Sequence, residues 1–206
     1  MMARYIGNKN RIARRFGVNI FGKARNPLLH KPNPPGVHGA RRRKKSDYGL
    51  QLEEKQKLKA IYGMLSEKQL VKYYKEALRI PGNTADNLAS MLECRLDTLV
   101  YRLKFGNSIF ASQQLVSHGH IFVNGKKVDR RSFQVKPGMV ISVKEKSRTV
   151  KAIVESVESP RREVPPYLTL DGNMSGQLMA KPTQEQMPWP IEIRLPEICD
   201  FLAHST

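Results

Sequence analysis

The asparagine–glycine pair Asn124-Gly125 constrains the fold more than any other feature of the sequence. It separates an apolar run at 121–123 from two lysines and a valine at 126–128. A type I′ turn needs positive φ at both central residues, and asparagine followed by glycine accepts this most readily. We therefore expect a β-hairpin here, with Lys126 and Lys127 directly after its turn.

Two short helices are expected before this hairpin. Leu96, Leu99, Val100 and Leu103 recur at the spacing of one helical face, which indicates a helix that packs on that face. Ser108 is a suitable N-cap for the second helix.

The residues after that second helix indicate its end and the strands that follow. Gly119 is a natural residue at which the second helix ends. Pro137-Gly138 indicates a turn, and the apolar residues at 140–143 indicate a closing strand.

Polar residues are expected to gather on one rim of this unit. Arg95 and Arg102 fall on a helical face away from the apolar stripe, so we expect both to be exposed. Gln114 and His118 lie one turn apart on the second helix and can share an outward face. The expected rim contains Arg95, Arg102, His118, Lys126 and Lys127. The other RNA-binding candidates of this unit are Gln114, His120 and Asn124.

This order of two helices, a hairpin and a strand resembles the S-four RNA-binding module. The resemblance rests on RLD at 95–97, QLVSHGHIFVNGKKV at 114–128 and PG at 137–138. It implies RNA binding without implying what is done to the RNA.

The charge of the chain also indicates a polyanionic partner. The formal net charge is +18, and such an excess is better explained by a partner such as nucleic acid than by the fold itself. Residues 1–50 hold 13 lysines or arginines and one acid, whereas residues 152–206 hold 4 and 8. The N-terminal half is therefore expected to face the polyanion, and the acidic end to face protein or solvent.

Cysteine usage and hydropathy restrict the remaining classes. The two cysteines, Cys94 and Cys199, indicate no disulfide framework and favour a reducing compartment. No apolar run approaches the roughly 18 residues of a membrane span. The Arg-rich, acid-free start is typical of a transit peptide, but Gly7, Gly17 and Gly22 interrupt any long amphipathic helix there.

Residues 1–48 are interpreted as a basic arm punctuated by glycine and proline. Glycines let a backbone lie close to a phosphate chain, and arginines can fork onto phosphate oxygens. A solvated or nuclear-targeting patch is the alternative for the cationic run at 41–45. The RNA-binding candidates of the arm are Arg4, Lys9, Arg11, Arg14, Arg15, His38, Arg41, Arg42, Arg43, Lys44 and Lys45.

A helical region is expected between the arm and the module. Ser66 begins a capping-box pattern, and Thr84 is the expected cap of a further helix. Tyr73 and Tyr74 lie at helical spacing, where most aromatic residues are core rather than base-stacking.

Over nearly its whole length the chain resembles bacterial ribosomal proteins of the uS-four family. The matching segments are ARYIG at 3–7, PGVHG at 35–39, SDYG at 46–49, EKQKL at 54–58, IYG at 61–63 and YKEA at 74–77. The resemblance adds Tyr48, Lys55 and Lys57 to the RNA-binding candidates. It implies a cytoplasmic constituent of the small ribosomal subunit that binds 16S rRNA early, nucleates assembly of the subunit body and contributes to translational accuracy. It also implies contact with small-subunit ribosomal protein five and a position near incoming mRNA.

The sequence departs from the family pattern at three places. Many relatives hold zinc through N-terminal cysteines, but the positions aligned with the first pair are Asn10 and Ala13. Zinc is therefore not expected, and no other cofactor is implied. Ile109 and Gln113 stand where relatives commonly carry arginines, and the tail around Trp189 matches poorly.

The expected fold class is α+β. An N-terminal basic arm over 1–48 and a helical region over 49–93 are followed by the helix-helix-hairpin module over 94–150. A linker and C-terminal segment over 151–206, with a strand at 167–170, is expected to pack back on the helical region.

Two other classes of RNA-binding protein are the alternatives to a ribosomal protein. An RNA-modifying enzyme can use the same module as an appendage, as some pseudouridine synthases and tyrosyl-tRNA synthetases do. Such an enzyme needs a catalytic domain, and no catalytic constellation is visible outside 94–150. A free RNA chaperone is the third class, but the long helical region argues against that smaller architecture.

Overall fold

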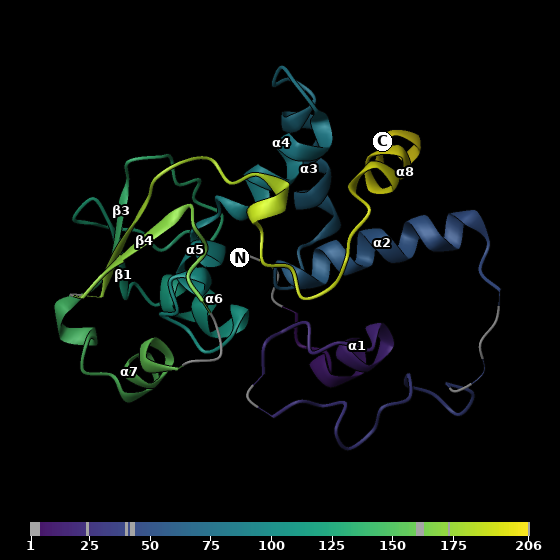
Figure 1. The fold of residues 1–206 in the computed structure, drawn as a ribbon, viewed down its shortest axis with the longest axis horizontal. Helices are drawn as coiled ribbons and strands as arrows, with labels where there is room; N and C mark the ends of the chain where they lie inside the picture. Colours follow the sequence, from purple (N-terminus) through teal and green to yellow (C-terminus); the bar gives the residue numbers. More distant parts are fainter. Residues whose placement is uncertain are drawn as a thin grey trace. The chain divides into compact units, whose positions relative to one another are not determined.

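The chain folds into two compact units that together are α+β, as predicted (Figure 1). The computed structural model describes residues 5–23, 25–39, 41, 44–159, 163–172 and 174–205. One unit, the helical unit, contains the residues up to Leu88 together with those from Trp189 onward. The other, the sheet unit, is Ala89–Pro188.

The helical unit is organised around three helices. The C-terminal helix, Leu195–Ser205, packs along the long helix Asp47–Ile61 and also contacts the helix Glu67–Ala77. Trp189, at the start of the returning tail, donates from Nε1 to the hydroxyl of Tyr62 at 3.1 Å. The helices of this unit are α1 (Lys9–Phe16), α2 (Asp47–Ile61), α3 (Glu67–Ala77), the first part of α4 (Thr84–Glu93) and α8 (Leu195–Ser205).

Short polar side chains fix where these helices begin. The hydroxyl of Ser66 accepts a hydrogen bond from the amide of Gln69, so the predicted N-cap of α3 is confirmed. The prediction for α4 was wrong by one residue. Oδ1 of Asn83, not Thr84, accepts from the amide of Ala85 at 2.9 Å.

The arm is more regular than its glycines and prolines suggest. Residues Lys9–Phe16 form α1, a helix that was not predicted. Asn8 caps its start, and Gly17 ends it with φ of 68°, in the left-handed region that glycine accepts without strain. Arg14 then donates from Nε to the carbonyl of Asn33 at 2.9 Å, which ties a later loop back to the helix.

The sheet unit contains an antiparallel sheet in the order β2-β1-β3-β5-β4. Its strands are β1 (Ile121–Val123), β2 (Lys126–Lys127), β3 (Val140–Val143), β4 (Leu168–Asp171) and β5 (Ser175–Leu178). Its remaining helical elements are α5 (Leu96–Arg102), α6 (Ile109–Ser117), α7 (Lys151–Glu158) and two single 3₁₀ turns, Glu145–Ser147 and Gln184–Gln186.

The predicted hairpin is confirmed. Asn124 and Gly125 have φ of 48° and 75°, as a type I′ turn requires. Phe122 pairs with Lys127 and Val123 with Lys126, so the two lysines form the edge strand of the sheet.

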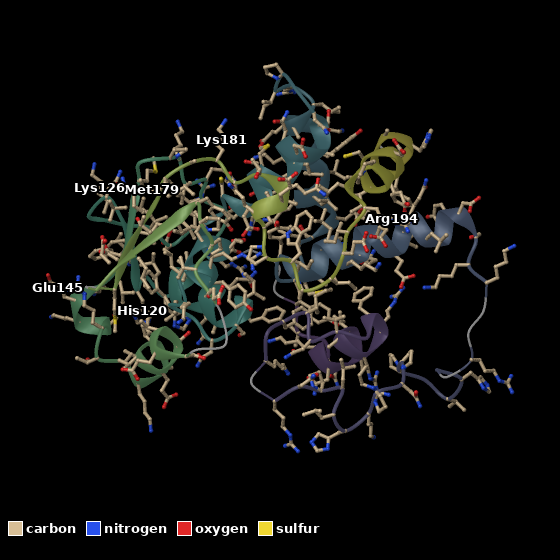
Figure 2. The ribbon with its side chains drawn as sticks, viewed as in Figure 1. His120, Lys126, Glu145, Met179, Lys181 and Arg194 are labelled. Carbon is tan, nitrogen blue, oxygen red and sulfur yellow. The ribbon has the colours of Figure 1, made fainter. Side chains whose placement is uncertain are left out.

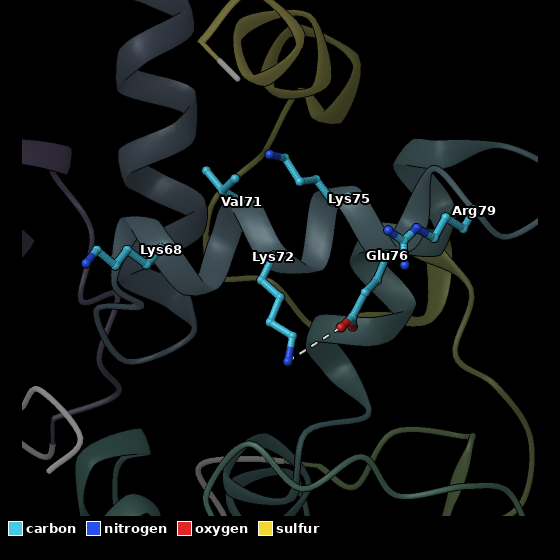
Figure 3. A pocket seen from close by; sticks show the side chains of 6 residues that line it. All are labelled: Lys68, Val71, Lys72, Lys75, Glu76 and Arg79. Atoms are coloured by element: carbon cyan, nitrogen blue, oxygen red, sulfur yellow. Dashed lines mark ion pairs between the residues drawn. The ribbon is translucent and has the colours of Figure 1, made fainter.

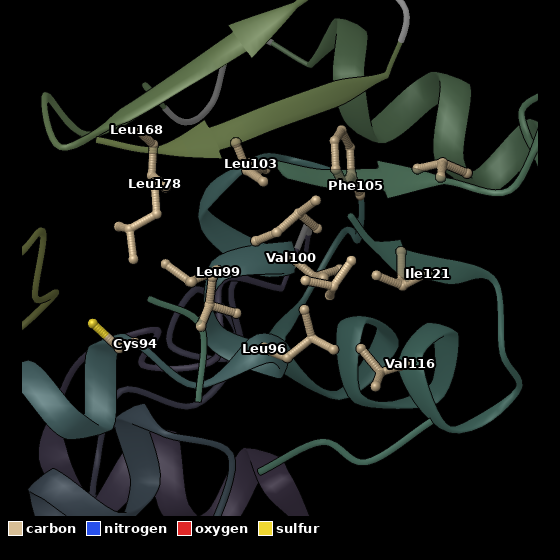
Figure 4. Close-up of a cluster of buried hydrophobic side chains, with 14 of the residues drawn as sticks. Cys94, Leu96, Leu99, Val100, Leu103, Phe105, Val116, Ile121, Leu168 and Leu178 are labelled. Carbon is tan, nitrogen blue, oxygen red and sulfur yellow. The ribbon is translucent and has the colours of Figure 1, made fainter. Parts of the chain in front are cut away.

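The core of the sheet unit lies between the sheet and the two helices α5 and α6 (Figure 4). The predicted stripe of α5 is buried, and Leu99, Val100 and Leu103 have no exposed surface. Val116 from α6 and Ile121 from β1 join the same cluster. Burial of such side chains stabilises the fold by roughly 1.5–3 kcal/mol each.

The C-terminal segment is divided differently from the sequence-based expectation. Residues 151–206 were expected to return as a whole to the helical region. Instead 151–188 belong to the sheet unit, where β4 and the unpredicted β5 extend the sheet beyond β3. Only the residues from Trp189 onward join the helical unit.

Among the described residues, no helix combines the length and apolar character that a membrane crossing requires.

Candidate RNA-binding surface

The exposed edge of the hairpin presents two lysines side by side. Lys126 and Lys127 are exposed, and both lie on the edge strand β2. Gly119, at the end of α6, has φ of 71°, and a Cβ there would overlap the Cε atom of Lys127. The stem of Lys127 therefore lies over the end of α6, which joins the hairpin to the helix on one surface.

Two histidines continue this surface from α6 into β1. The rings of His118 and His120 have centroids 6.2 Å apart. His118 is exposed, and half-buried His120 is oriented by a 2.9 Å hydrogen bond between its Nδ1 and the hydroxyl of Ser147. Figure 2 shows His120 toward α7 and Lys126 at the outer edge of the same unit.

The remaining two predicted residues of the hairpin region differ in role. Gln114 is exposed one helical turn before His118, as predicted. Asn124 is exposed too, but its Oδ1 accepts a hydrogen bond from the amide of Val140 at 2.8 Å and so holds the hairpin tip to β3. We call the set Gln114, His118, His120, Asn124, Lys126 and Lys127 the hairpin surface.

Arg95 and Arg102 do not belong to this surface, and the prediction that both are exposed was wrong. Arg95 is only 3% exposed. Its Nε and Nη2 donate to the two carboxylate oxygens of Asp97 at 3.0 and 2.8 Å. The Nε2 of Gln113 also donates to Asp97, at 3.2 Å.

Arg102 is held in a second buried cluster. Its Nε and Nη2 donate to the two oxygens of Glu93 at 2.5 and 3.3 Å. The hydroxyl of Tyr167 donates to the same carboxylate at 2.8 Å, and Arg102 also donates from Nη1 to the carbonyl of Pro188 at 3.2 Å. Burial first, and the negative charge of Glu93 second, raise the pKa of Tyr167. This network keeps both charges satisfied inside the unit.

Two candidate lysines on α2 also serve the fold. Lys55 is buried, donates from Nζ to Glu67 at 2.8 Å, and lies 4.2 Å above the ring centre of Phe201. Lys57 donates to Glu54 at 2.5 Å. Both amino groups are thus engaged with carboxylates of the helical unit, contrary to an open RNA-facing position.

The candidates of the arm differ in their exposure. Lys9 and Arg14 are half-buried, and the other described candidates are exposed. Lys45 forms an ion pair with Glu53, and the ring of exposed Tyr48 lies 5.3 Å from that of Phe201. Arg4, Arg42 and Arg43 lie outside the described residues. The exposed cations and histidine of the arm are Arg11, Arg15, His38, Arg41, Lys44 and Lys45.

Within the described part of the chain, no three His, Cys, Asp or Glu side chains gather in a group that could hold a metal. Oδ1 of Asn10 accepts a hydrogen bond from Nζ of Lys23 at 2.8 Å. Nε2 of His30 accepts from Nε of Arg25 at 3.1 Å. These contacts are polar and local, and they supply no thiolate donor for zinc.

One cationic face was missed in the sequence. Lys68, Lys72 and Lys75 recur along α3 at i, i+4 and i+7, and Arg79 follows in the next turn. All four side chains are exposed and line one surface hollow. The spacing that identified the buried side of α3 also marks this face, but only the apolar positions were interpreted.

The exposed cations of the arm, the hairpin surface and the α+β fold define a basic protein with surfaces suited to a polyanion. Residues 4–93 match the family described as the ribosomal protein S4/S9 N-terminal domain, and residues 94–141 match the S4 domain.

Relatives match over the full length of both chains. The small ribosomal subunit protein uS4 of Protochlamydia amoebophila is 79% identical over 206 residues. Its counterparts in Chlamydia muridarum and Chlamydia felis are 60% identical over 209 residues and 58% identical over 211. The chain belongs to the small ribosomal subunit protein uS4 family. Its relatives are ribosomal proteins rather than enzymes.

Proposed function

We propose that this chain is a structural constituent of the small ribosomal subunit in the cytoplasm and binds 16S rRNA directly. The observation that carries the proposal is the hairpin surface, where two exposed lysines lie with exposed His118 and half-buried His120 on an S4 domain. Lysine ammonium groups neutralise phosphates, and imidazole rings can stack on unpaired bases. Family membership supports the same conclusion.

The finer role proposed is that of a primary rRNA-binding protein that nucleates assembly of the subunit body and contributes to translational accuracy. The exposed cations of the arm support early binding, because they can contact naked rRNA without a prior protein. The acidic balance of residues 152–206 supports a protein-facing region, and small-subunit ribosomal protein five is the proposed neighbour. Incoming mRNA is the second proposed neighbour.

The direct test measures equilibrium binding to 16S rRNA as a function of salt. With about 6–10 phosphate contacts, affinity should fall roughly 10³–10⁵-fold between 50 and 200 mM salt. The variant Lys126→Gln with Lys127→Gln should lower the slope of log affinity against log salt by about 2. Lys151→Gln with Lys181→Gln is the matched control, since it removes two exposed charges elsewhere in the sheet unit. A flat salt response would refute the proposal.

Primary binding can be tested separately by order of addition. The protein alone should bind protein-free 16S rRNA and then accelerate joining of other small-subunit proteins. If it binds only after another protein has been added, it is a later-joining component and does not nucleate assembly.

We propose further that no zinc is required. The purified protein should hold less than about one tenth of an equivalent of metal, because among the described residues no three His, Cys, Asp or Glu side chains gather in a group that could hold it. Metal analysis after dialysis measures this directly, and stoichiometric zinc would contradict it.

A further inference from the structure

The outer face of α3 carries a row of cations that the hairpin surface and the arm do not include. At 100° per residue, Lys68, Lys72, Lys75 and Arg79 fall within an arc of about 60° if the turn after α3 continues its rotation. The rise from Lys68 to Lys75 is about 10 Å. Figure 3 shows Lys68, Lys72 and Lys75 along α3 and Arg79 just past its end, with Val71 and Glu76 beside them.

Buried side chains on the opposite face fix the orientation of this row. Leu70, Tyr73, Tyr74 and Ala77 are all buried on the inner side of α3. The helix therefore cannot rotate the cations inward without exposing that apolar face. The row is a fixed feature of the helical unit.

Carboxylates of the described residues neutralise little of this charge. Of the four cations, Lys72 is the one with an ion pair to a described residue, Glu76, at 3.6 Å. The side chains of Lys72 and Glu76 are 75% and 40% exposed, so this ion pair contributes little to stability and can open at small cost. The other glutamate of α3, Glu67, is engaged by Lys55 and Lys59.

The lining of the hollow between these residues selects the kind of partner. Five of its six lining residues are charged, and half-buried Val71 is the single apolar one. A helix or strand of another protein needs a larger apolar surface to dock stably. A row of long cationic side chains over a shallow hollow instead suits a phosphate backbone.

We propose that the outer face of α3 is a separate track for one strand of an rRNA backbone. Lys68, Lys75 and Arg79 bind successive or nearby phosphates, and Lys72 joins them when a phosphate replaces Glu76. This inference rests on the proposed function and adds to it a second contact, in the helical unit.

The first test compares charge-neutral variants in equilibrium binding to 16S rRNA. Lys68→Gln with Lys75→Gln and Arg79→Gln should lower the salt slope by about 2–3 and weaken binding roughly 10- to 100-fold at 100 mM salt. The matched control, Lys136→Gln with Lys151→Gln and Lys181→Gln, removes three exposed charges from the sheet unit and should change the slope by less than about 1.

A single substitution on the same face tests whether removal of a negative charge strengthens RNA binding, as the proposal requires. Glu76→Gln leaves helix propensity nearly unchanged and removes the competing carboxylate, so it should tighten binding several-fold. Melting curves of all variants should match the wild type, because none of these side chains is buried. If the triple variant behaves like its matched control, the α3 track is refuted.

The second test locates the contact on the RNA. Lys72→Cys in a Cys199→Ser background carries an iron–EDTA tether, and buried Cys94 stays unlabelled. Radical cleavage should fall on one continuous stretch of 16S rRNA, distinct from cleavage by a tether at Lys126→Cys. Cleavage from position 126 alone refutes the track and leaves the proposed function intact. Cleavage from neither position refutes both the track and the proposed function. If the triple variant keeps normal RNA affinity but its reconstituted subunits lose a neighbouring protein, the outer face of α3 is a protein contact instead.

Discussion

The guanidinium of Arg102 and the carboxylate of Glu93 form a buried ion pair in which Nε lies 2.5 Å from Oε1. Glu93 is at the end of α4 and Arg102 is at the end of α5, so the pair joins two consecutive helices. Tyr167, just before β4, donates to the same carboxylate and adds a third segment. The cluster therefore has a structural role in the sheet unit.

Replacement of Arg102 should destabilise the sheet unit severely. Arg102→Met should cost roughly 3–5 kcal/mol, because it leaves the carboxylate of Glu93 buried without its partner. Glu93→Leu combined with Arg102→Met should recover much of that loss, since no buried charge then remains. Urea unfolding of both variants measures this, with exposed Lys136→Gln as a control near wild-type stability. If the free energy of unfolding of Arg102→Met lies within about 1 kcal/mol of the wild-type value, the structural role of the Arg102–Glu93 pair is contradicted.

The loss of stability of the helical unit at low pH should come in part from Glu67. Burial acts to raise the pKa of Glu67, but hydrogen bonds from Lys55 and Lys59 outweigh it and hold the pKa below the ordinary value of 4.5. Folding thus favours the carboxylate form, so its stabilisation is present above about pH 4.5 and is lost as pH falls further. Because Glu67 is 46% exposed, the effect should stay below about 1 kcal/mol.

Melting temperatures measured between pH 3 and 7 test this contribution. Glu67→Gln should flatten the acid limb of the curve while leaving a small deficit at pH 7. Glu155→Gln, at an exposed position of α7, is a matched control that should leave the acid limb unchanged. Equal acid limbs for Glu67→Gln and wild type would show that the two lysines do not stabilise the carboxylate.

Both thiols should react slowly in the folded protein. Burial raises the pKa of Cys94 to about 11, and burial with the nearby charge of Asp200 raises that of Cys199 to about 11. At pH 8 the reactive thiolate should be on the order of 100-fold scarcer than in an unfolded chain. Alkylation followed by mass spectrometry should show slow labelling that becomes fast in urea. Fast labelling of Cys94 without urea would place it outside the core.

Local sequence patterns predicted the elements whose geometry depends on a few adjacent residues. The Asn124-Gly125 turn, the caps at Ser66 and Ser108, and Gly119 at the end of α6 all follow from backbone and side-chain chemistry within four residues. The apolar stripe of α5 was predicted for the same reason. This is why the hairpin surface, which depends on that turn, could be placed from the sequence.

The errors concern interactions that periodicity does not describe. Arg95 and Arg102 lie off the apolar stripe of α5, yet the helix is covered on almost every side, and Tyr101 is its one half-exposed residue. Buried carboxylates at Asp97 and Glu93 make this burial possible. A helical pattern shows where apolar residues lie, but it does not show that a cation has an acidic partner.

The last prediction concerns the arm, whose cations the structure leaves largely exposed. Deletion of residues 1–45 should leave residues 46–206 folded, because α8 packs on both α2 and α3 and the sheet unit has its own core. The deletion should weaken binding to 16S rRNA and lower its salt slope, since several phosphate contacts are lost together.

Melting curves and salt-dependent binding of the two proteins test both halves of this expectation. Within the arm, Arg14 binds the carbonyls of Asn33 and Pro34, so Arg14→Gln should loosen its loop, whereas Arg11→Gln should remove one exposed charge and leave the loop intact. Loss of cooperative melting after the deletion would show that the arm belongs to the core of the helical unit. An unchanged salt slope would show that its cations do not contact phosphates, because each lost contact must lower the slope by about 0.7–0.9.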